Sequence, residues 1–174
     1  SCTINQSLPA LYHPTSFFYK HDSSLPVQPS PDCHFELKTN KTYLISWSGY
    51  STYSHFKSFL SDHPLQPQVV PLAIIDLDSG YAVVRSLTLP YRLTLLSTAV
   101  HDNIFYMLGG ADFQCTNPAC HSVQKLEISS DFRTFSFVSV SSSNPAFQGV
   151  KGQSLAVCTD GSFVVFDGLS SNST

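Results

Sequence analysis

The chain has 174 residues, of which 42% are hydrophobic, 13% aromatic and 12% charged, and it carries a formal net charge of -3. A chain of this length buries roughly 70% of the surface that its unfolded form exposes, and its apolar content excludes a disordered protein. The small charge, without any run of Lys or Arg, argues against a nucleic-acid partner, and no apolar run approaches the roughly 18 residues of a membrane span.

The first 34 residues are rich in proline. They contain Pro9, Pro14, Pro26, Pro29 and Pro31. Proline fixes φ and donates no backbone hydrogen bond, so we expect residues 1–34 to form an extended, irregular arm that lies along another element. The chain opens at Ser1-Cys2 without Met, as a mature or trimmed N-terminus does.

A strand pattern recurs three times from residue 35 onward. Each copy has a β-rich strand, a polar turn and a strongly apolar strand that ends at glycine. The predicted pairs of strands are Phe35–Leu37 with Thr42–Gly49, Ser97–Val100 with Ile104–Gly110, and Ser154–Val157 with Ser162–Gly168. The terminal glycines are roughly 60 residues apart, a spacing typical of propellers and solenoids.

Two further strands are predicted after each of the first two copies. They are Leu72–Leu77 and Tyr81–Leu87 in the first repeat, and Ser122–Ser129 and Thr134–Val140 in the second. Each repeat thus has four antiparallel strands, which is the strand content of one propeller blade. The stretch Ser54–Asp62 has helical periodicity and is interpreted as a short insertion.

Three segments carry a likeness to a known family: Ile74–Tyr81, Leu89–Arg92 and Asn103–Gly110. They hold a strand that ends in Gly-Gly, an aromatic residue after a turn and a Pro-x-Arg step, and in these features residues 35–168 resemble kelch repeats. The Gly-Gly doublet is complete only in the second repeat, and Tyr81 and Phe135 stand where that family has tryptophan.

The resemblance implies an all-β fold of antiparallel four-stranded β-propeller blades. The alternative is a β-sandwich, which short strands with Gly and Pro turns also build. Propellers close with about four to eight blades, whereas residues 35–174 hold about three. We therefore expect an incomplete ring that the remaining blades or another chain completes, and we interpret the C-terminal Ser-Ser-Asn-Ser-Thr as a loop that was cut or lost to disorder.

Three N-x-[ST] sequons mark candidate glycosylation sites, and they lie at Asn5, Asn40 and Asn172. Such a sequon acts as a glycan acceptor in a secreted protein. The chain is rich in Ser and Thr, so the alternative of one or two chance sequons stays open. Together with the cysteines described next, the sequons predict a secreted or cell-surface glycoprotein.

The five cysteines give an odd count, so at least one is unpaired or bonded to another chain. We predict disulfides between Cys2 and Cys33 and between Cys115 and Cys120, because the latter two flank a turn that brings Cα atoms within bonding distance. Disulfides persist in oxidising compartments. Cys158 lies in an apolar strand, where we expect a buried free thiol.

No catalytic, cofactor or metal motif is complete. Asp76-x-Asp78-x-Gly80 begins like a calcium loop but lacks the distal Glu, and a β-turn explains the same residues. Cys115 and the Cys-His pairs at residues 33–34 and 120–121 lack the second couple of a structural zinc site. Gly152–Ala156 resembles a hydrolase elbow but opens a strand rather than a strand-to-helix turn. The sequence therefore predicts no enzyme, no cofactor and no metal.

Three long connections carry aromatic residues among small polar ones. The candidate binding residues are Tyr50, Tyr53, His55, Phe56, Phe113 and Phe147. Aromatics of this kind suit protein or carbohydrate recognition, although they would also serve to pack the loops onto a disc. We predict an extracellular recognition or assembly module with a protein or glycan partner. The alternatives are a self-assembling structural subunit and a viral attachment glycoprotein domain.

Overall fold

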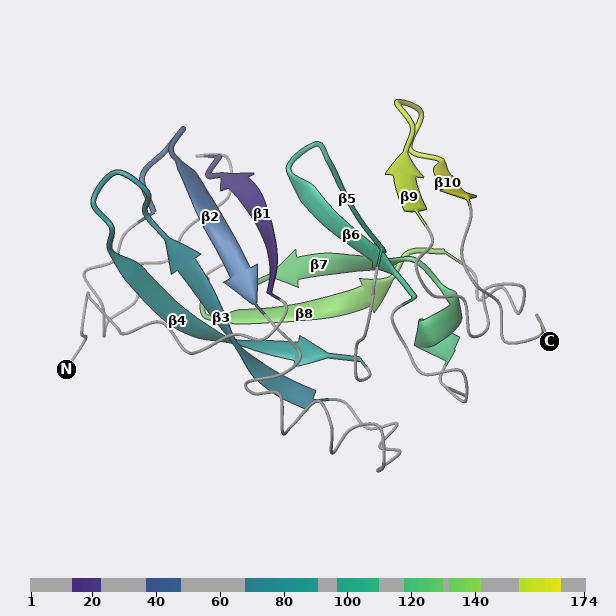
Figure 1. Ribbon diagram of the computed structural model, residues 1–174, viewed down its shortest axis with the longest axis horizontal. Helices are drawn as coiled ribbons and strands as arrows, with labels where there is room; N and C mark the ends of the chain where they lie inside the picture. Colours follow the sequence, from purple (N-terminus) through teal and green to yellow (C-terminus); the bar gives the residue numbers. More distant parts are fainter. Residues whose placement is uncertain are drawn as a thin grey trace. The chain divides into compact units, whose positions relative to one another are not determined.

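The computed structural model describes residues 14–22, 37–47, 68–90, 97–109, 118–129, 132–141 and 154–166 (Figure 1). Its regular elements are β1 (Thr15–Lys20), β2 (Thr42–Trp47), β3 (Gln68–Ile75), β4 (Ala82–Leu89), β5 (Ser97–His101), β6 (Ile104–Leu108), η1 (a 3-10 turn, Pro118–His121), β7 (Gln124–Ile128), β8 (Thr134–Ser139), β9 (Ser154–Val157) and β10 (Phe163–Phe166). The predicted all-β fold class is confirmed. The described residues contain no helix with the length and apolarity of a membrane span.

The strands form an eight-stranded sheet in the order β1-β2-β3-β4-β8-β7-β6-β5, and β9 and β10 form a separate hairpin. The first four strands of the chain are therefore neighbours, and so are the next four. The first predicted repeat contained Phe35–Leu37 in place of β1, and the repeat itself stays a prediction. β4 and β8 pair in parallel, with Leu87 opposite Phe135, so the two groups share one sheet. The interpretation of the groups as propeller blades stays a prediction.

By their contacts the residues fall into two compact units. The first unit carries β1, β2, most of β3 and β4, and the start of β8. The second unit carries β5, β6, η1, most of β7, the end of β8, and the β9–β10 hairpin.

The outer strand of the first group differs from the expected one. Leu37 is not part of a strand, and Phe35 and Glu36 lie outside the described residues. The place beside β2 is taken by β1, in which Phe17 lies opposite Ile45 in an antiparallel ladder. β1 begins directly after Pro14 and contains no proline, so a regular strand fits inside the segment that was expected to be irregular.

Alternation along β1 shows why it forms. Phe17 and Tyr19 are 6% and 3% exposed, whereas Phe18 between them is 62% exposed. Successive side chains of a strand point to opposite faces, so the two buried rings share one face with Ile45 of β2. Burial of a large side chain of this kind contributes about 1.5–3 kcal/mol. The residues 15–20 are therefore part of the core of the first unit.

The second unit has a core of its own. Leu108, Val123 and Leu155 are buried together, and the residues packed against them are Ala99, Tyr106, Phe163 and Val165. The ring of Tyr106 meets the ring of Phe163 edge-on at 5.3 Å. These contacts attach the β9–β10 hairpin to β5 and β6, because strands that pack through one apolar face must bury that face against another element.

Candidate functional site

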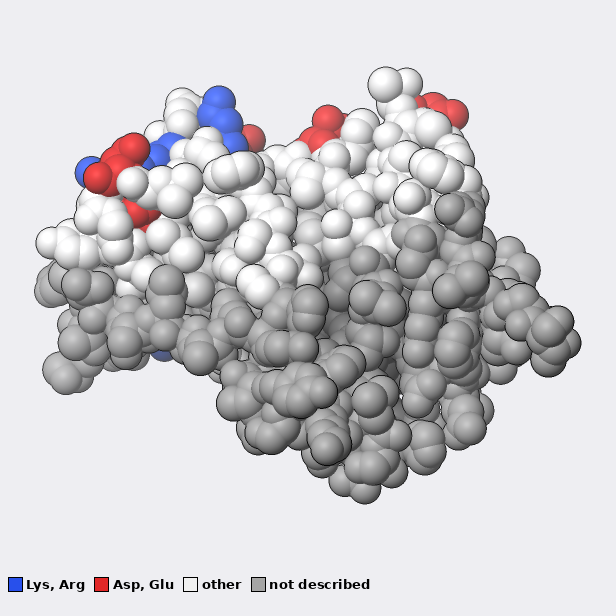
Figure 2. Space-filling model, in the orientation of Figure 1, with Lys and Arg blue, Asp and Glu red and all other residues white. Residues whose placement is uncertain are grey.

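Most of the predicted site residues lie outside the described part of the chain. They are Asn5, Asn172, Cys2, Cys33, Cys115, Tyr50, Tyr53, His55, Phe56, Phe113 and Phe147, together with the helix-like stretch 54–62. The structure describes Asn40, Cys120 and Cys158. Of these, Asn40 is an exposed residue of the turn before β2. Figure 2 shows basic and acidic side chains close together at the upper left of the view.

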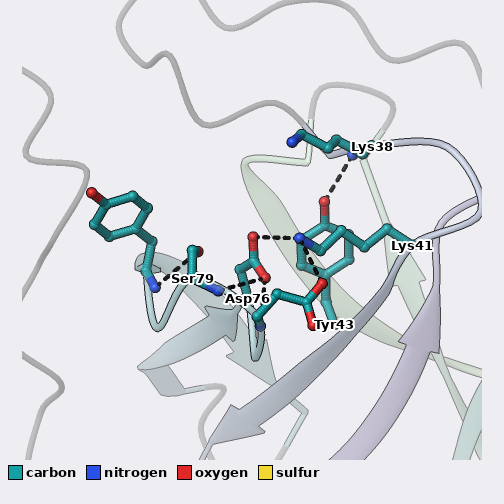
Figure 3. Close-up of polar contacts among 7 residues, drawn as sticks. Lys38, Lys41, Tyr43, Asp76 and Ser79 are labelled. Carbon is teal, nitrogen blue, oxygen red and sulfur yellow. Dashed lines mark hydrogen bonds and ion pairs between the residues drawn. The ribbon is translucent and has the colours of Figure 1, made fainter.

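Two turns of the first unit form a surface that we call the turn surface. One turn comprises residues 38–41, directly before β2, and the other comprises residues 76–81, between β3 and β4 (Figure 3). Lys41 Nζ joins them, because it lies 2.7 Å from Asp76 Oδ2 and 3.2 Å from Asp78 Oδ2. The two turns are thus joined by side chains that are 35 residues apart in the sequence.

The 76–81 turn is fixed by its own hydrogen bonds. Asp76 Oδ1 accepts from the backbone N–H groups of Asp78 (2.9 Å) and Ser79 (3.4 Å). The Gly80 N–H donates to the Asp76 carbonyl, and Ser79 Oγ accepts from the Tyr81 N–H. Gly80 has a φ of 73°, a conformation that glycine adopts without strain. These bonds are those of an Asx turn between two strands.

The charges of the turn surface are mutually compensated. The hydrogen bond from Lys41 is the main cause that lowers the pKa of Asp76 to about 2. The same bond is the main cause that raises the pKa of Lys41. Both groups are therefore charged at neutral pH. The ammonium group stands between the two carboxylates that the Asp-x-Asp pattern offers to a calcium ion, and no cluster of three or more metal-ligating side chains occurs among the described residues.

The 38–41 turn is held by hydrogen bonds to His21, the residue directly after β1. The His21 N–H donates to the Lys41 carbonyl, and the Asn40 N–H donates to the His21 carbonyl. The Lys38 N–H donates to the hydroxyl of the buried Tyr43. Asn40 is exposed and has a φ of 60°, in the left-handed region that asparagine tolerates better than most residues. The sequon residue Asn40 thus lies at an exposed, anchored turn.

Two large apolar side chains project from the turn surface. Leu77 is 54% exposed and Tyr81 is 48% exposed. The sequence interpretation placed binding residues on the long connections and assigned Tyr81 to the repeat pattern. A sequence signal for this surface exists, since a turn of Asp, Ser and Gly directly precedes an aromatic residue. Turns lie at the protein surface, so the sequence could have predicted that Tyr81 is exposed.

A buried aromatic cluster supports the turn surface. His21 is 2% exposed, and its ring packs against the Phe132 ring at 5.2 Å in an edge-on arrangement. Burial lowers the pKa of His21, although Asp22 acts in the opposite direction, so the ring is neutral at neutral pH. Burial also raises the pKa of Tyr19 to about 12. Arg85 Nε donates to the Phe132 carbonyl, which fixes the chain at this point.

The second unit contains a buried polar network around Gln124, which is 1% exposed. Its Nε2 donates to Ser139 Oγ at 2.8 Å, to Ser122 Oγ at 2.9 Å and to the Ala119 carbonyl at 3.1 Å. The network attaches η1, which contains the buried Cys120, to β7 and β8. Its polar groups are bonded to one another, so we assign it a structural role.

The thiol of Cys158 was expected to be free and buried. It is a free thiol in the structure, and it is half-buried rather than buried. The chain turns at this point, because the Gly161 N–H donates to the Cys158 carbonyl.

Comparison of this chain with models of protein families, with curated proteins and with solved structures finds no match.

Proposed function

We propose that this chain is a non-enzymatic recognition or assembly module of a secreted or cell-surface glycoprotein, and that it binds a protein or a glycan. The observation that carries the proposal is the turn surface. It exposes Leu77 and Tyr81 on a backbone that the Lys41–Asp76 ion pair and the Asx turn hold in place. A preorganised surface loses little entropy on binding, and tyrosine is enriched among the residues that dominate interface energetics.

The extracellular part of the proposal is supported by the cysteines and by Asn40. Cys120 is buried in η1, and we propose that it is bonded to Cys115, with a Cys2–Cys33 bridge as the second pair. Stable disulfides belong to oxidising compartments, where sequons such as the one at Asn40 also receive glycans.

The test is binding of the secreted full chain, labelled with a fluorophore, to a glycan array and to intact mammalian cells. We expect the double variant Leu77→Ser, Tyr81→Ser to lose binding by a factor of about ten or more, as the loss of an interface anchor does. The matched control is Phe18→Ser, which removes a comparably exposed ring from β1. If the control lost binding and the double variant kept it, the turn surface would not be the binding site.

Self-assembly is a second candidate function, and the β9–β10 hairpin favours it. On the outward face of this hairpin Val164 and Phe166 are 44% and 58% exposed, and Val164 lies opposite the exposed Ala156. Large exposed apolar side chains on neighbouring strands are typical of interaction sites. Native mass spectrometry with and without a reductant distinguishes the candidates, since a self-assembling subunit gives concentration-dependent oligomers and a binding module gives a monomer.

A further inference from the structure

The turn surface contains a candidate modification site in addition to its exposed apolar residues. Asn40 opens the sequon Asn40-Lys41-Thr42, and both Asn40 and Thr42 are exposed. Oligosaccharide is attached to the chain before folding is complete, so the folded protein must leave room for a bulky group at the acceptor. An exposed turn that projects from the strand ends meets this requirement, whereas an acceptor on the buried face of β2 would not.

The acceptor belongs to a turn that an ion pair joins to the turn of the proposed binding residues. Lys41 follows Asn40 directly, and its Nζ is bonded to Asp76 and Asp78, which flank Leu77 in the sequence. The backbone of Asn40 is held as well, because its N–H donates to the His21 carbonyl. A glycan on Asn40 would therefore start from a fixed point in the turn that is joined to the 76–81 turn. From there its first sugars can extend over the 76–81 turn.

We infer that Asn40 is an N-glycan acceptor and that the glycan controls access to Leu77 and the 76–81 turn. The inference rests on the proposed extracellular recognition function, for which it supplies the regulation. In the attachment step, the side-chain amide nitrogen of Asn40 forms a bond to C1 of the sugar of a lipid-linked diphosphate oligosaccharide. The bond from C1 to the diphosphate oxygen breaks, and the lipid diphosphate leaves with the bonding electrons while the amide gives up one proton.

The sequon provides a matched pair of variants. Thr42→Ala removes the sequon and leaves Asn40 in place, whereas Thr42→Ser makes a change of similar size and keeps the sequon. Thr42 is exposed at the first position of β2, where it lies opposite Lys20. Neither variant alters a buried side chain, so we expect both to fold as the parent chain does.

The experiment expresses the full chain and both variants with a cleavable secretion signal in eukaryotic cells and measures site occupancy by glycopeptide mass spectrometry. We expect occupied Asn40 in the parent and in Thr42→Ser, and unoccupied Asn40 in Thr42→Ala. An unoccupied Asn40 in a folded, secreted parent chain that carries glycans at Asn5 or Asn172 would overturn the inference while leaving the proposed function intact. A secreted chain without glycan at any sequon and with five reduced thiols would overturn the extracellular proposal itself.

Hydroxyl-radical footprinting then measures access to the 76–81 turn. We expect oxidation of Leu77 to rise at least about twofold in Thr42→Ala relative to Thr42→Ser, because the bulky glycan no longer shields the turn. Oxidation of Phe166 in the second unit is the internal reference and should not change. Equal oxidation of Leu77 in the two variants, with Asn40 occupied in one of them, would contradict control of access. Absence of binding in Thr42→Ala despite an accessible turn would count against the recognition function and not against the glycan site.

Discussion

At the scale of single residues, Asp76 combines two roles that the sequence shows only in part. Its Oδ1 accepts the hydrogen bonds that shape the 76–81 turn, and its Oδ2 pairs with Lys41 of the other turn. The first role depends on the shape of the side chain and the second on its charge. Substitution by asparagine separates the two, because the amide keeps an acceptor oxygen and loses the charge.

The pH dependence of stability tests the charge of Asp76. Its pKa in the folded chain is about 2, below the ordinary value of 3.8. A depressed carboxyl pKa stabilises the fold above pH 4, and this contribution is lost as the pH falls from about 4 to about 2. We expect Asp76→Asn to flatten that part of the curve of unfolding free energy against pH, measured by urea denaturation. Lys41→Met should flatten the same part, and an effect of only one of the two variants would contradict the pair.

Phe132 has an unusual backbone conformation, with a φ of 55° although it carries a large side chain. It is 6% exposed and packs against His21 and Tyr19. The left-handed conformation is unfavourable for a bulky residue and is retained where the surroundings enforce it. The packing of the ring therefore offsets the strain of its own backbone.

At this position we expect the glycine variant to be more stable than the alanine variant, which is the reverse of the usual order. Phe132→Ala is expected to destabilise the chain by about 3–5 kcal/mol through the lost packing. Phe132→Gly should be less destabilising than Phe132→Ala, because glycine adopts this φ without strain. Phe18→Ala, at a ring that is 62% exposed, is the control and should change the unfolding free energy by less than about 0.5 kcal/mol. A glycine variant that is less stable than the alanine variant would show that the backbone is not strained.

At the scale of elements, the end of β1 is joined to the 38–41 turn and to the segment before β8 through His21. The backbone of His21 bonds to Asn40 and Lys41, and its ring lies against Phe132. The groups that face the ring are the Tyr19 hydroxyl, 3.5 Å from Nδ1, the apolar Phe132 and the charge of Asp22. Protonation would place a charge in this largely apolar cluster, which is unfavourable.

Mild acid should therefore weaken the attachment of β1. The pKa of His21 is lowered in the folded chain, so the unfolded chain binds more protons and stability falls as the pH drops below the ordinary histidine value of 6.5. We expect the melting temperature to decrease between pH 7.5 and pH 5.5, and to decrease less in His21→Phe. Burial also lowers the pKa of His121 in the second unit, so His121→Phe should remove a separate share of the effect. An unchanged pH response in His21→Phe would exclude this role.

At the scale of the whole molecule, the chain order within the sheet is two runs of four neighbouring strands joined by the parallel pair β4 and β8. The first run is complete only because β1 lies beside β2. A proline-rich arm that merely covers the surface would tolerate polar substitution at every position. A core strand tolerates it only at alternate positions.

Adjacent residues of β1 give a direct test of this organisation. Phe17→Asp should place an uncompensated charge in the core and destabilise the chain by more than about 4 kcal/mol, since buried unpaired charges are among the most damaging changes. Phe18→Asp changes the neighbouring, 62% exposed ring and should have little effect. Urea unfolding and the yield of soluble protein measure both. If both variants were as stable as the parent chain, residues 15–20 would be a peripheral arm and not a core strand.

Most strands could be predicted from local patterns. The apolar runs that became β2, β6 and β10, and the turn of Asp, Ser and Gly between β3 and β4, are visible in the sequence because strand propensity and turn chemistry are properties of a few consecutive residues. β1 was not predicted, because the five prolines of residues 1–34 indicated an irregular segment. None of these prolines lies within Thr15–Lys20.

The sequence by itself therefore determined the all-β class, the positions of most strands and the sequon at Asn40. Only the tertiary structure decided which strand covers the edge of β2 and which cation stands between Asp76 and Asp78. The physical reason is distance along the chain. A strand partner and a charge partner are chosen by burial and by Coulomb attraction between groups that meet in space, and Lys41 and Asp76 meet across 35 residues that no local pattern spans.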